Sequence, residues 1–240
     1  MIEEFLRIVD ESKADGFLFE NVQSILHPRN KGTFSSFLAE AAKIGFHTTV
    51  IEANALSYGV AQKRQRVVVL GFRKKVIKAP VPSHADSSHK VNGDLKPPVT
   101  AKSAIRGFQA KKFFEPEEVV KGRWAEHLRE ITPGMNYKAL TAWAGHPTPA
   151  FIAETRFWNF LLKLHPDAPS WTIAANPGPW IGPFHWDNRR LRSVELAALQ
   201  GFPENYHFLG ERRSRVRQIG NAMPPPLARA MIQPLLKAAA

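Results

Sequence analysis

The sequence has 240 residues, with 33 Lys and Arg against 21 Asp and Glu, and a formal net charge of +12. This basic balance favours a polyanionic partner such as nucleic acid. The absence of cysteine excludes disulfides, thiolate metal sites and thiol nucleophiles within these residues. No apolar run approaches the roughly 20 residues that span a bilayer, and residues 1–6 do not resemble a secretory leader, so we expect a cytoplasmic protein.

The first 75 residues carry the pattern of an α/β sheet. Amphipathic spacing predicts a helix over 2–12, and the apolar run 16–19 is typical of a strand buried on both faces. Another helix is predicted over 33–45, followed by strands over 47–53 and 66–72. Three strands are too few for a complete doubly wound domain, so the sequence predicts a partial sheet.

Polar residues stand next to two of these strands. Glu20 and Asn21 end the first strand, where ligands bind in open α/β sheets, although asparagine is also common in turns and caps. Arg64 and Arg66 precede the last strand, and strand periodicity places them on one side, opposite Gln65. Two guanidinium groups there would bind planar acceptors or phosphates; the alternative is a solvated basic turn.

The composition changes between residues 76 and 170. Scattered Pro, Lys, His and Gly with weak periodicity indicate an irregular basic insert. A Gly/Pro loop with aromatic residues follows over 176–186, and it could equally be a structural loop. Ser193 begins an expected helix that ends near Gly201, and the arginines of 212–217 are typical of a solvated face. His84 and His89 have no metal-ligand spacing, so we expect no metal site.

Taken together, these segments resemble the C-terminal half of a DNA (cytosine-5)-methyltransferase. Glu20-Asn21-Val22 resembles the family's ENV motif, and residues 62–66 resemble its QxRxR motif, with Ala61 where proline is common. Residues 192–206 resemble the ninth motif of the family, and residues 218–225 resemble the tenth. The four motifs occur in the family's order around a variable basic segment, which makes the resemblance more specific than any one of them.

The resemblance implies a fold and a division of the chain. It implies an α/β fold, in which a partial Rossmann-like methyltransferase sheet carries an inserted, irregular and mainly β target-recognition domain. The expected segments are 1–75 for the catalytic domain, 76–190 for target recognition, and 191–240 for the return to the catalytic domain.

Two of the family's motifs are missing from this sequence. Neither the cofactor-binding FxGxG motif nor the Pro-Cys motif of the nucleophile occurs in it. The leading hypothesis is therefore one subunit of a split, heterodimeric enzyme, inactive alone and completed by a chain that carries both motifs. The alternative is a catalytically dead DNA-binding module or the relic of a truncated gene. A relic should lose polar site residues at random, and their retention favours the split enzyme.

The resemblance also implies roles in catalysis. In the family, a cysteine attacks C6 of a flipped-out cytosine, and S-adenosylmethionine methylates C5. Glu20, with its pKa raised by a closed site, would hold or protonate N3, and Arg66 would reach O2. Asn21 would orient the catalytic loop of the partner chain, and Arg64 would position that loop or a phosphate.

Four further positions follow from the same resemblance. Gln62 and Thr172 would contact double-stranded DNA, Thr172 near the target phosphates. Gly220 and Asn221 would border the S-adenosylmethionine site, which the partner chain completes. The insert would read the target sequence, while its lysines neutralise phosphates without reading bases.

Overall fold

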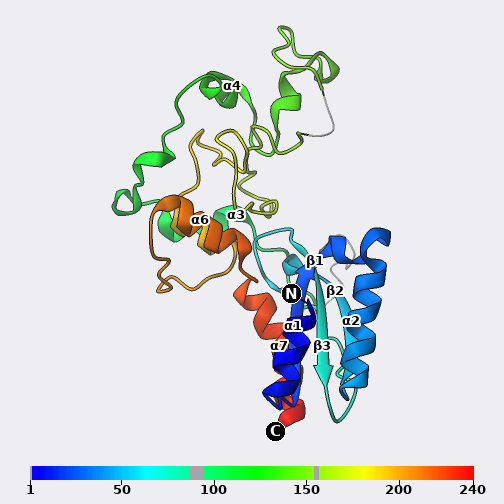
Figure 1. Ribbon diagram of the computed structural model, residues 1–240. Helices are drawn as coiled ribbons and strands as arrows, with labels where there is room; N and C mark the ends of the chain where they lie inside the picture. Colours follow the sequence, from blue (N-terminus) through cyan, green and yellow to red (C-terminus); the bar gives the residue numbers. More distant parts are fainter. Residues whose placement is uncertain (1, 87–93, 154–156) are drawn as a thin grey trace. The chain divides into compact units, whose positions relative to one another are not determined.

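The computed structural model describes residues 2–86, 94–153 and 157–240, so His89 and two parts of the predicted recognition segment lie outside the described residues (Figure 1). The described chain divides into two compact units. The sheet unit lies within 1–58, 64–96 and 225–240, and the insert unit comprises residues 59–63 with the described part of 97–224. The predicted return segment 191–240 is therefore shared, with 191–224 in the insert unit and 225–240 in the sheet unit.

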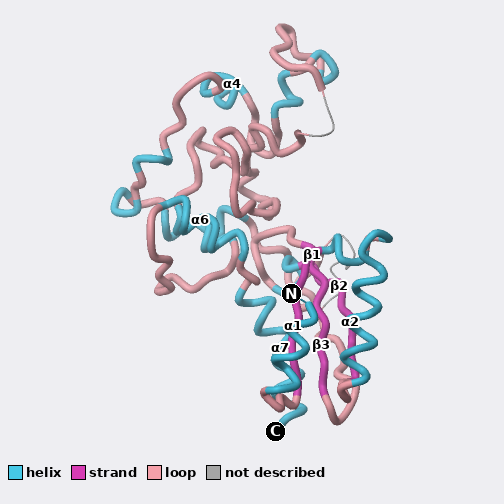
Figure 2. Tube along the Cα trace, in the orientation of Figure 1, coloured by secondary structure: helices cyan, strands magenta, loops and turns pink. Residues whose placement is uncertain are grey.

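The sheet unit is built on three strands, β1 (Gly16–Val22), β2 (His47–Asn54) and β3 (Gln65–Phe72) (Figure 2). Their order is β1-β3-β2, and β3 runs antiparallel to both neighbours. All three predicted strands are confirmed. The first is longer than its apolar run, because Glu20 and Asn21 still pair with β3.

Helices cover both faces of this sheet. On one face, α1 (Ile2–Glu11) and α2 (Lys31–Lys43) pack with strand residues in a cluster that includes Phe17, Phe37 and Val67. The ring centroids of Phe17 and Phe46 are 5.0 Å apart in this cluster. On the other face lies α7 (Pro225–Ala239), where a Cβ built on Gly16 would be 3.3 Å from Leu235. No helix in the described part of the chain is long and apolar enough to cross a membrane.

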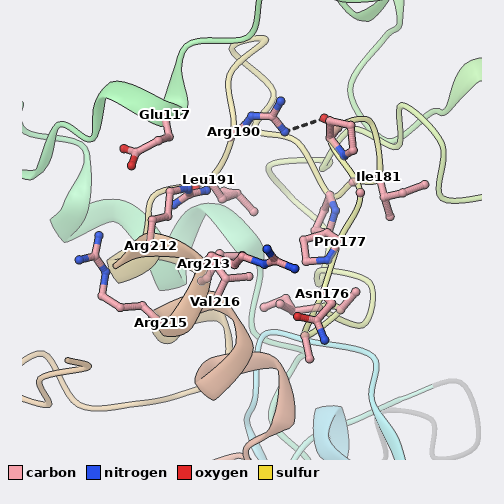
Figure 3. Close-up of a pocket in the computed structure, with 18 of the residues that line it drawn as sticks. Glu117, Asn176, Pro177, Ile181, Arg190, Leu191, Arg212, Arg213, Arg215 and Val216 are labelled. Atoms are coloured by element: carbon pink, nitrogen blue, oxygen red, sulfur yellow. Dashed lines mark hydrogen bonds between the residues drawn. The ribbon is translucent and has the colours of Figure 1, made fainter. Parts of the chain in front are cut away.

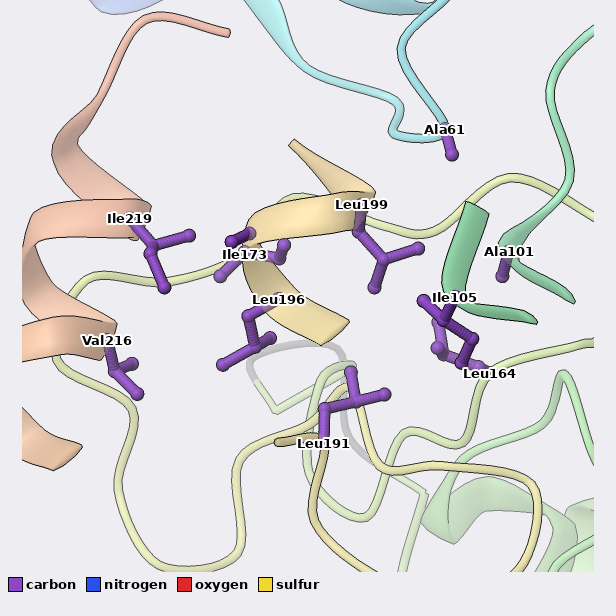
Figure 4. Close-up of a cluster of buried hydrophobic side chains, with 11 residues drawn as sticks. Ala61, Ala101, Ile105, Leu164, Ile173, Leu191, Leu196, Leu199, Val216 and Ile219 are labelled. Carbon is purple, nitrogen blue, oxygen red and sulfur yellow. The ribbon is translucent and has the colours of Figure 1, made fainter. Parts of the chain in front are cut away.

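The insert unit has four short helices, α3 (Ala101–Ile105), α4 (Ala125–Glu130), α5 (Ser193–Leu199) and α6 (Arg212–Asn221). Helix α5 lies in the middle of one apolar core, where its leucines meet side chains of α3, α6 and the 59–63 loop (Figure 4). That core contains Ala61, Ala101, Ile105, Leu164, Ile173, Leu191, Leu196, Ala197, Leu199, Val216 and Ile219. A second core joins Leu128, Leu140 and Phe184 to a group of aromatic rings.

The expectation of a mainly β insert is wrong. Within the described part of 76–190, the chain forms isolated β-bridges and short helical turns but no β-strand. Proline explains the difference, because it has no N–H to donate to a ladder. Pro177, Pro179 and Pro183 stand within seven residues of each other around the bridges at Ile181 and Phe184, so neither bridge extends into a strand.

A buried lysine gives the insert unit a testable dependence on pH. Lys163 is 2% exposed, and its Nζ donates to the carbonyl of Ile131 and, over 2.7 Å, to Asn188 Oδ1. Burial beside neutral oxygens lowers the pKa of Lys163 to about 8. Between pH 8 and its ordinary value of 10.5, the unfolded chain binds the additional proton. The free energy of unfolding should therefore rise with pH across this interval.

Urea denaturation of the wild type and of Lys163→Met, from pH 7.5 to pH 10, measures this effect. The wild type should gain stability relative to the variant as the pH increases, because methionine carries no proton to release. The exposed Lys121→Met serves as the matched control and should parallel the wild type. Parallel profiles for the wild type and Lys163→Met would show that Lys163 does not titrate in this range.

Candidate functional site

The register of β1 and β3 brings Glu20 and Arg66 together. Glu20 stands opposite Val68, and Val22 stands opposite Arg66, so Glu20 and Arg66 are diagonal neighbours on one face of the sheet. Arg66 Nε lies 2.6 Å from Glu20 Oε1, and the two side chains are 11% and 25% exposed. The pair is therefore largely sheltered from water but still accessible, as a binding site requires.

Arg64 adds a second cation to this pair. Its side chain is almost completely buried, and burial, followed by the charge of Arg66, lowers its pKa to about 10, while Glu20 opposes the shift. Burial also lowers the pKa of Arg66, although Glu20 counteracts it. Two guanidinium groups, of which Arg66 makes the ion pair, are thus coupled electrostatically to one carboxylate in a poorly hydrated place. Such a site favours a ligand that offers acceptor atoms or negative charge.

Asn21 does not join this cluster. It stands opposite Val67, whose side chain belongs to the apolar cluster with α1 and α2, so Asn21 and Glu20 point to opposite faces. Its Oδ1 accepts a 2.8 Å hydrogen bond from the backbone N–H of Val22. The structure thus brings together Glu20, Arg64 and Arg66 but not Asn21, whose predicted role toward a partner loop stays a prediction.

Gln62 is fully buried in the insert unit rather than displayed on its surface. Its Nε2 donates to Gln200 Oε1 over 3.2 Å, and its Oε1 accepts from Ile173 N over 3.2 Å. Gln200 in turn donates to the carbonyl of Ile219. The side chain therefore ties the 59–63 loop to α5 and α6, which is a positioning function different from the predicted contact with DNA.

Thr172 is exposed and lies beside the same loop. Its Oγ1 donates to the carbonyl of Lys63 over 2.7 Å, and Lys63 N donates to the carbonyl of Ser170 over 2.8 Å. The segments around Lys63 and Thr172 are thus bonded side by side. The exposed position of Thr172 is compatible with its predicted contact to a phosphate, which stays a prediction.

Gly220 and Asn221 were the residues predicted to border the cofactor. A Cβ on Gly220 would lie 2.5 Å from Ala175 Cα, so α6 needs glycine there to approach the backbone of the 174–175 segment. Asn221 is exposed at the end of α6. Helix packing alone accounts for the glycine, and neither residue lines the large pocket of the insert unit. Their place at the border of an S-adenosylmethionine site completed by a partner chain stays a prediction.

That large pocket has a volume of about 840 Å³ and is rich in arginine. In Figure 3, arginines of α6 lie on one side and the loop at Asn176 and Pro177 on the other. Glu115 is shared by two of these cations, Arg212 at 2.5 Å and Arg215 at 3.2 Å. Arg190 lines the same pocket. Burial, and to a smaller extent the charge of Arg212, lowers the pKa of Arg190.

This pocket could not be predicted from the sequence, because its arginine-rich wall is assembled from separate segments. The arginines of 212–217 were predicted to be a solvated face, whereas Arg212 and Arg215 bond to Glu115, about 100 residues earlier. The lining has four arginines against two glutamates, and this excess of guanidinium groups makes the pocket a candidate for phosphate contact. No group of three His, Asp or Glu side chains suited to a metal occurs among the described residues.

Proteins of similar fold are methyltransferases. The chain superposes over 97% of its length on 72% of a prophage-encoded E. coli protein described as a DNA modification methyltransferase, with a TM-score of 0.60 and 20% identity. Its superposition on S. pombe Dnmt2 covers 98% of this chain and 72% of that protein, with a TM-score of 0.54 and 15% identity. At these identities the likeness defines the fold alone, which is that of an α/β methyltransferase.

The sequence comparisons define the family. The profile of the C-5 cytosine-specific DNA methylases matches residues 1–237, and the chain belongs to this family. The type II methyltransferase M.SacI of Streptomyces achromogenes is 36% identical over 251 residues, which cover 99% of this chain and 64% of M.SacI. M.BbvI of Brevibacillus brevis is 27% identical over 97% of this chain and 61% of its own length. The chain thus spans a little under two thirds of these relatives.

Proposed function

We propose that this chain forms the target-recognising part, and one side of the cytosine pocket, of a DNA cytosine-5 methyltransferase. The observation that carries the proposal is the Glu20–Arg66 pair beside buried Arg64 in a member of this family. The nucleophilic thiol has to come from elsewhere, because the 240 residues contain no cysteine. We assign the thiol and most of the binding site for S-adenosylmethionine to a complementary chain. S-adenosylmethionine supplies the methyl group.

The pair suits the electronic demand of the reaction. When a thiolate adds to C6 of cytosine, the C5–C6 double bond opens and negative charge moves toward N3 and O2 of the ring. Arg66 can donate hydrogen bonds to O2, and Glu20, once it carries a proton, can donate to N3. Donors fixed in a sheltered site stabilise such charge better than water does. Buried Arg64, which is electrostatically coupled to both residues, adds further positive charge to the site.

The insert unit is suited to the contact with DNA. The chain carries a net charge of +12, and the arginine pocket offers guanidinium groups that fit phosphate oxygens. Phosphate contacts would position the duplex, and base contacts from the loop segments of the insert would select the target. Gln62 contributes indirectly in this scheme, by holding the 59–63 loop to α5 and α6.

The edge of the sheet offers a place for the complementary chain. Among the described residues, β1 has a neighbouring strand on one side only. An apolar edge strand exposes unpaired backbone groups, which makes it prone to pair with another chain. We therefore propose that a strand of the complementary chain adds to β1, next to Glu20, and thereby closes the cytosine pocket.

Reconstitution tests the proposal. The chain should transfer no methyl group from labelled S-adenosylmethionine to duplex DNA alone, and it should do so when coexpressed with the part of M.SacI that lies outside the match. Size-exclusion chromatography should then show a 1:1 complex. Methyl transfer by the isolated chain would overturn the division of labour, since no thiol is present. A mixture that neither associates nor transfers methyl groups would contradict the completed-enzyme proposal.

A further inference from the structure

Two tryptophans of the insert unit form an exposed aromatic pair next to a lysine. Trp158 and Trp171 are 42% and 38% exposed. Their ring centroids lie 4.8 Å apart with an interplanar angle of 70°, and Lys63 Nζ is 4.5 Å from the Trp171 ring centroid. Rings of this size are normally placed in a core, and these two belong to neither of the cores of the insert unit described above.

Hydrogen bonds fix the backbone on which these side chains stand. Ser170 N donates to the carbonyl of Ala61 over 2.8 Å, and Thr172 Oγ1 donates to the carbonyl of Lys63. The residues before and after Trp171 are thus both bonded to the segment that carries Lys63. The carbonyl of Trp158 accepts a hydrogen bond from Asn136. The aromatic surface is therefore preorganised, which lowers the entropy cost of placing a ligand on it.

We propose that an unpaired nucleobase of DNA stacks on one ring of the Trp158–Trp171 pair and packs edge-on against the other, while Lys63 neutralises a neighbouring phosphate. The proposal rests on the proposed function only in taking DNA as the ligand. Every base offers a π-face, and exposed aromatic rings combined with cations are the usual means of binding unpaired strands. An apolar protein surface fits less well, because it would cover the Lys63 amine without giving it a negative partner.

Binding of the full-length chain to oligothymidylate and to a fully paired duplex, measured by fluorescence anisotropy, tests the stacking. Trp158→Leu and Trp171→Leu should each weaken binding to oligothymidylate by about 10-fold or more, while binding to the duplex changes far less. Trp171→Phe should lose only part of the affinity, because phenylalanine still stacks. The matched control is Trp143→Leu, since Trp143 is 80% exposed in the same unit, and it should behave like the wild type.

Salt dependence tests the part assigned to Lys63. Lys63→Ala should reduce the slope of log affinity against log salt for oligothymidylate by about 0.7, the share of one single-strand phosphate, and Lys63→Arg should restore it. Equal losses for Trp171→Leu and Trp143→Leu, or unchanged affinity in both Trp158→Leu and Trp171→Leu, would overturn the proposal. These measurements require neither methyl transfer nor a complementary chain, so their failure is distinguishable from failure of the proposed methyltransferase.

Discussion

Glu20→Ala should slow methyl transfer by the proposed completed enzyme about 100-fold or more, because the proposed mechanism makes Glu20 a donor that stabilises charge developing on the cytosine ring. Glu20 and Arg66 are ion-paired on one face of the sheet, so Arg66→Ala should cause a loss of similar size. The measurement is the single-turnover rate of methyl transfer from labelled S-adenosylmethionine to duplex DNA. Single turnover separates the chemical step from DNA binding and product release.

The control for this experiment is another acidic residue of the same sheet. Glu52 lies on β2, is exposed, and contacts Gln23 at 3.4 Å, so Glu52→Ala should leave the rate unchanged. Arg66→Lys keeps the charge but loses the planar array of donors, and it should recover only part of the rate. A Glu20→Ala enzyme as fast as the Glu52→Ala control would remove Glu20 from the mechanism.

The helices and strands whose residues repeat at a regular period could be predicted from the sequence. The β-branched run after Arg66 predicted β3, and the apolar spacing around Phe37 predicted α2, because burial of one face repeats at the period of the element. The grouping of Arg64 with Arg66 on one side also agrees with their electrostatic coupling. The contact of Glu20 with Arg66 could not be predicted from periodicity alone, since it depends on the register between two strands and joins residues 46 positions apart in the chain.

Contacts between residues far apart in the chain could not be predicted from the sequence, because local patterns do not show which segments meet. The side chain of Gln62 could be assigned to DNA from its motif, but the partners that bury it, Gln200 and Ile173, follow it by more than 100 residues. Within the described part of the insert unit, contacts between residues far apart in the chain hold together segments that form no β-strand. One such contact, between Arg192 and Glu118, crosses 74 residues of the chain.

Arg192→Met should destabilise the insert unit by about 3–5 kcal/mol, because it leaves the buried carboxylate of Glu118 without its cation. Arg192 Nη2 donates to Glu118 Oε1 over 3.1 Å, its Nε bonds the other oxygen, and both side chains are less than one tenth exposed. Its Nη1 also donates to the carbonyls of Phe108 and Ala110 over 2.8 and 2.9 Å. Urea denaturation followed by tryptophan fluorescence at pH 7 measures the loss.

The pH dependence and a double variant identify the origin of this loss. The hydrogen bond from Arg192 holds the pKa of Glu118 below its usual range, so the pair stabilises the fold above the unfolded pKa. This contribution disappears as the pH falls toward the folded pKa, and the difference between wild type and Arg192→Met should shrink with it. Adding Glu118→Gln to Arg192→Met should restore part of the stability at pH 7, since no charge is then left buried. A double variant as unstable as the sum of the two single ones would instead assign the loss to the severed backbone contacts of the guanidinium.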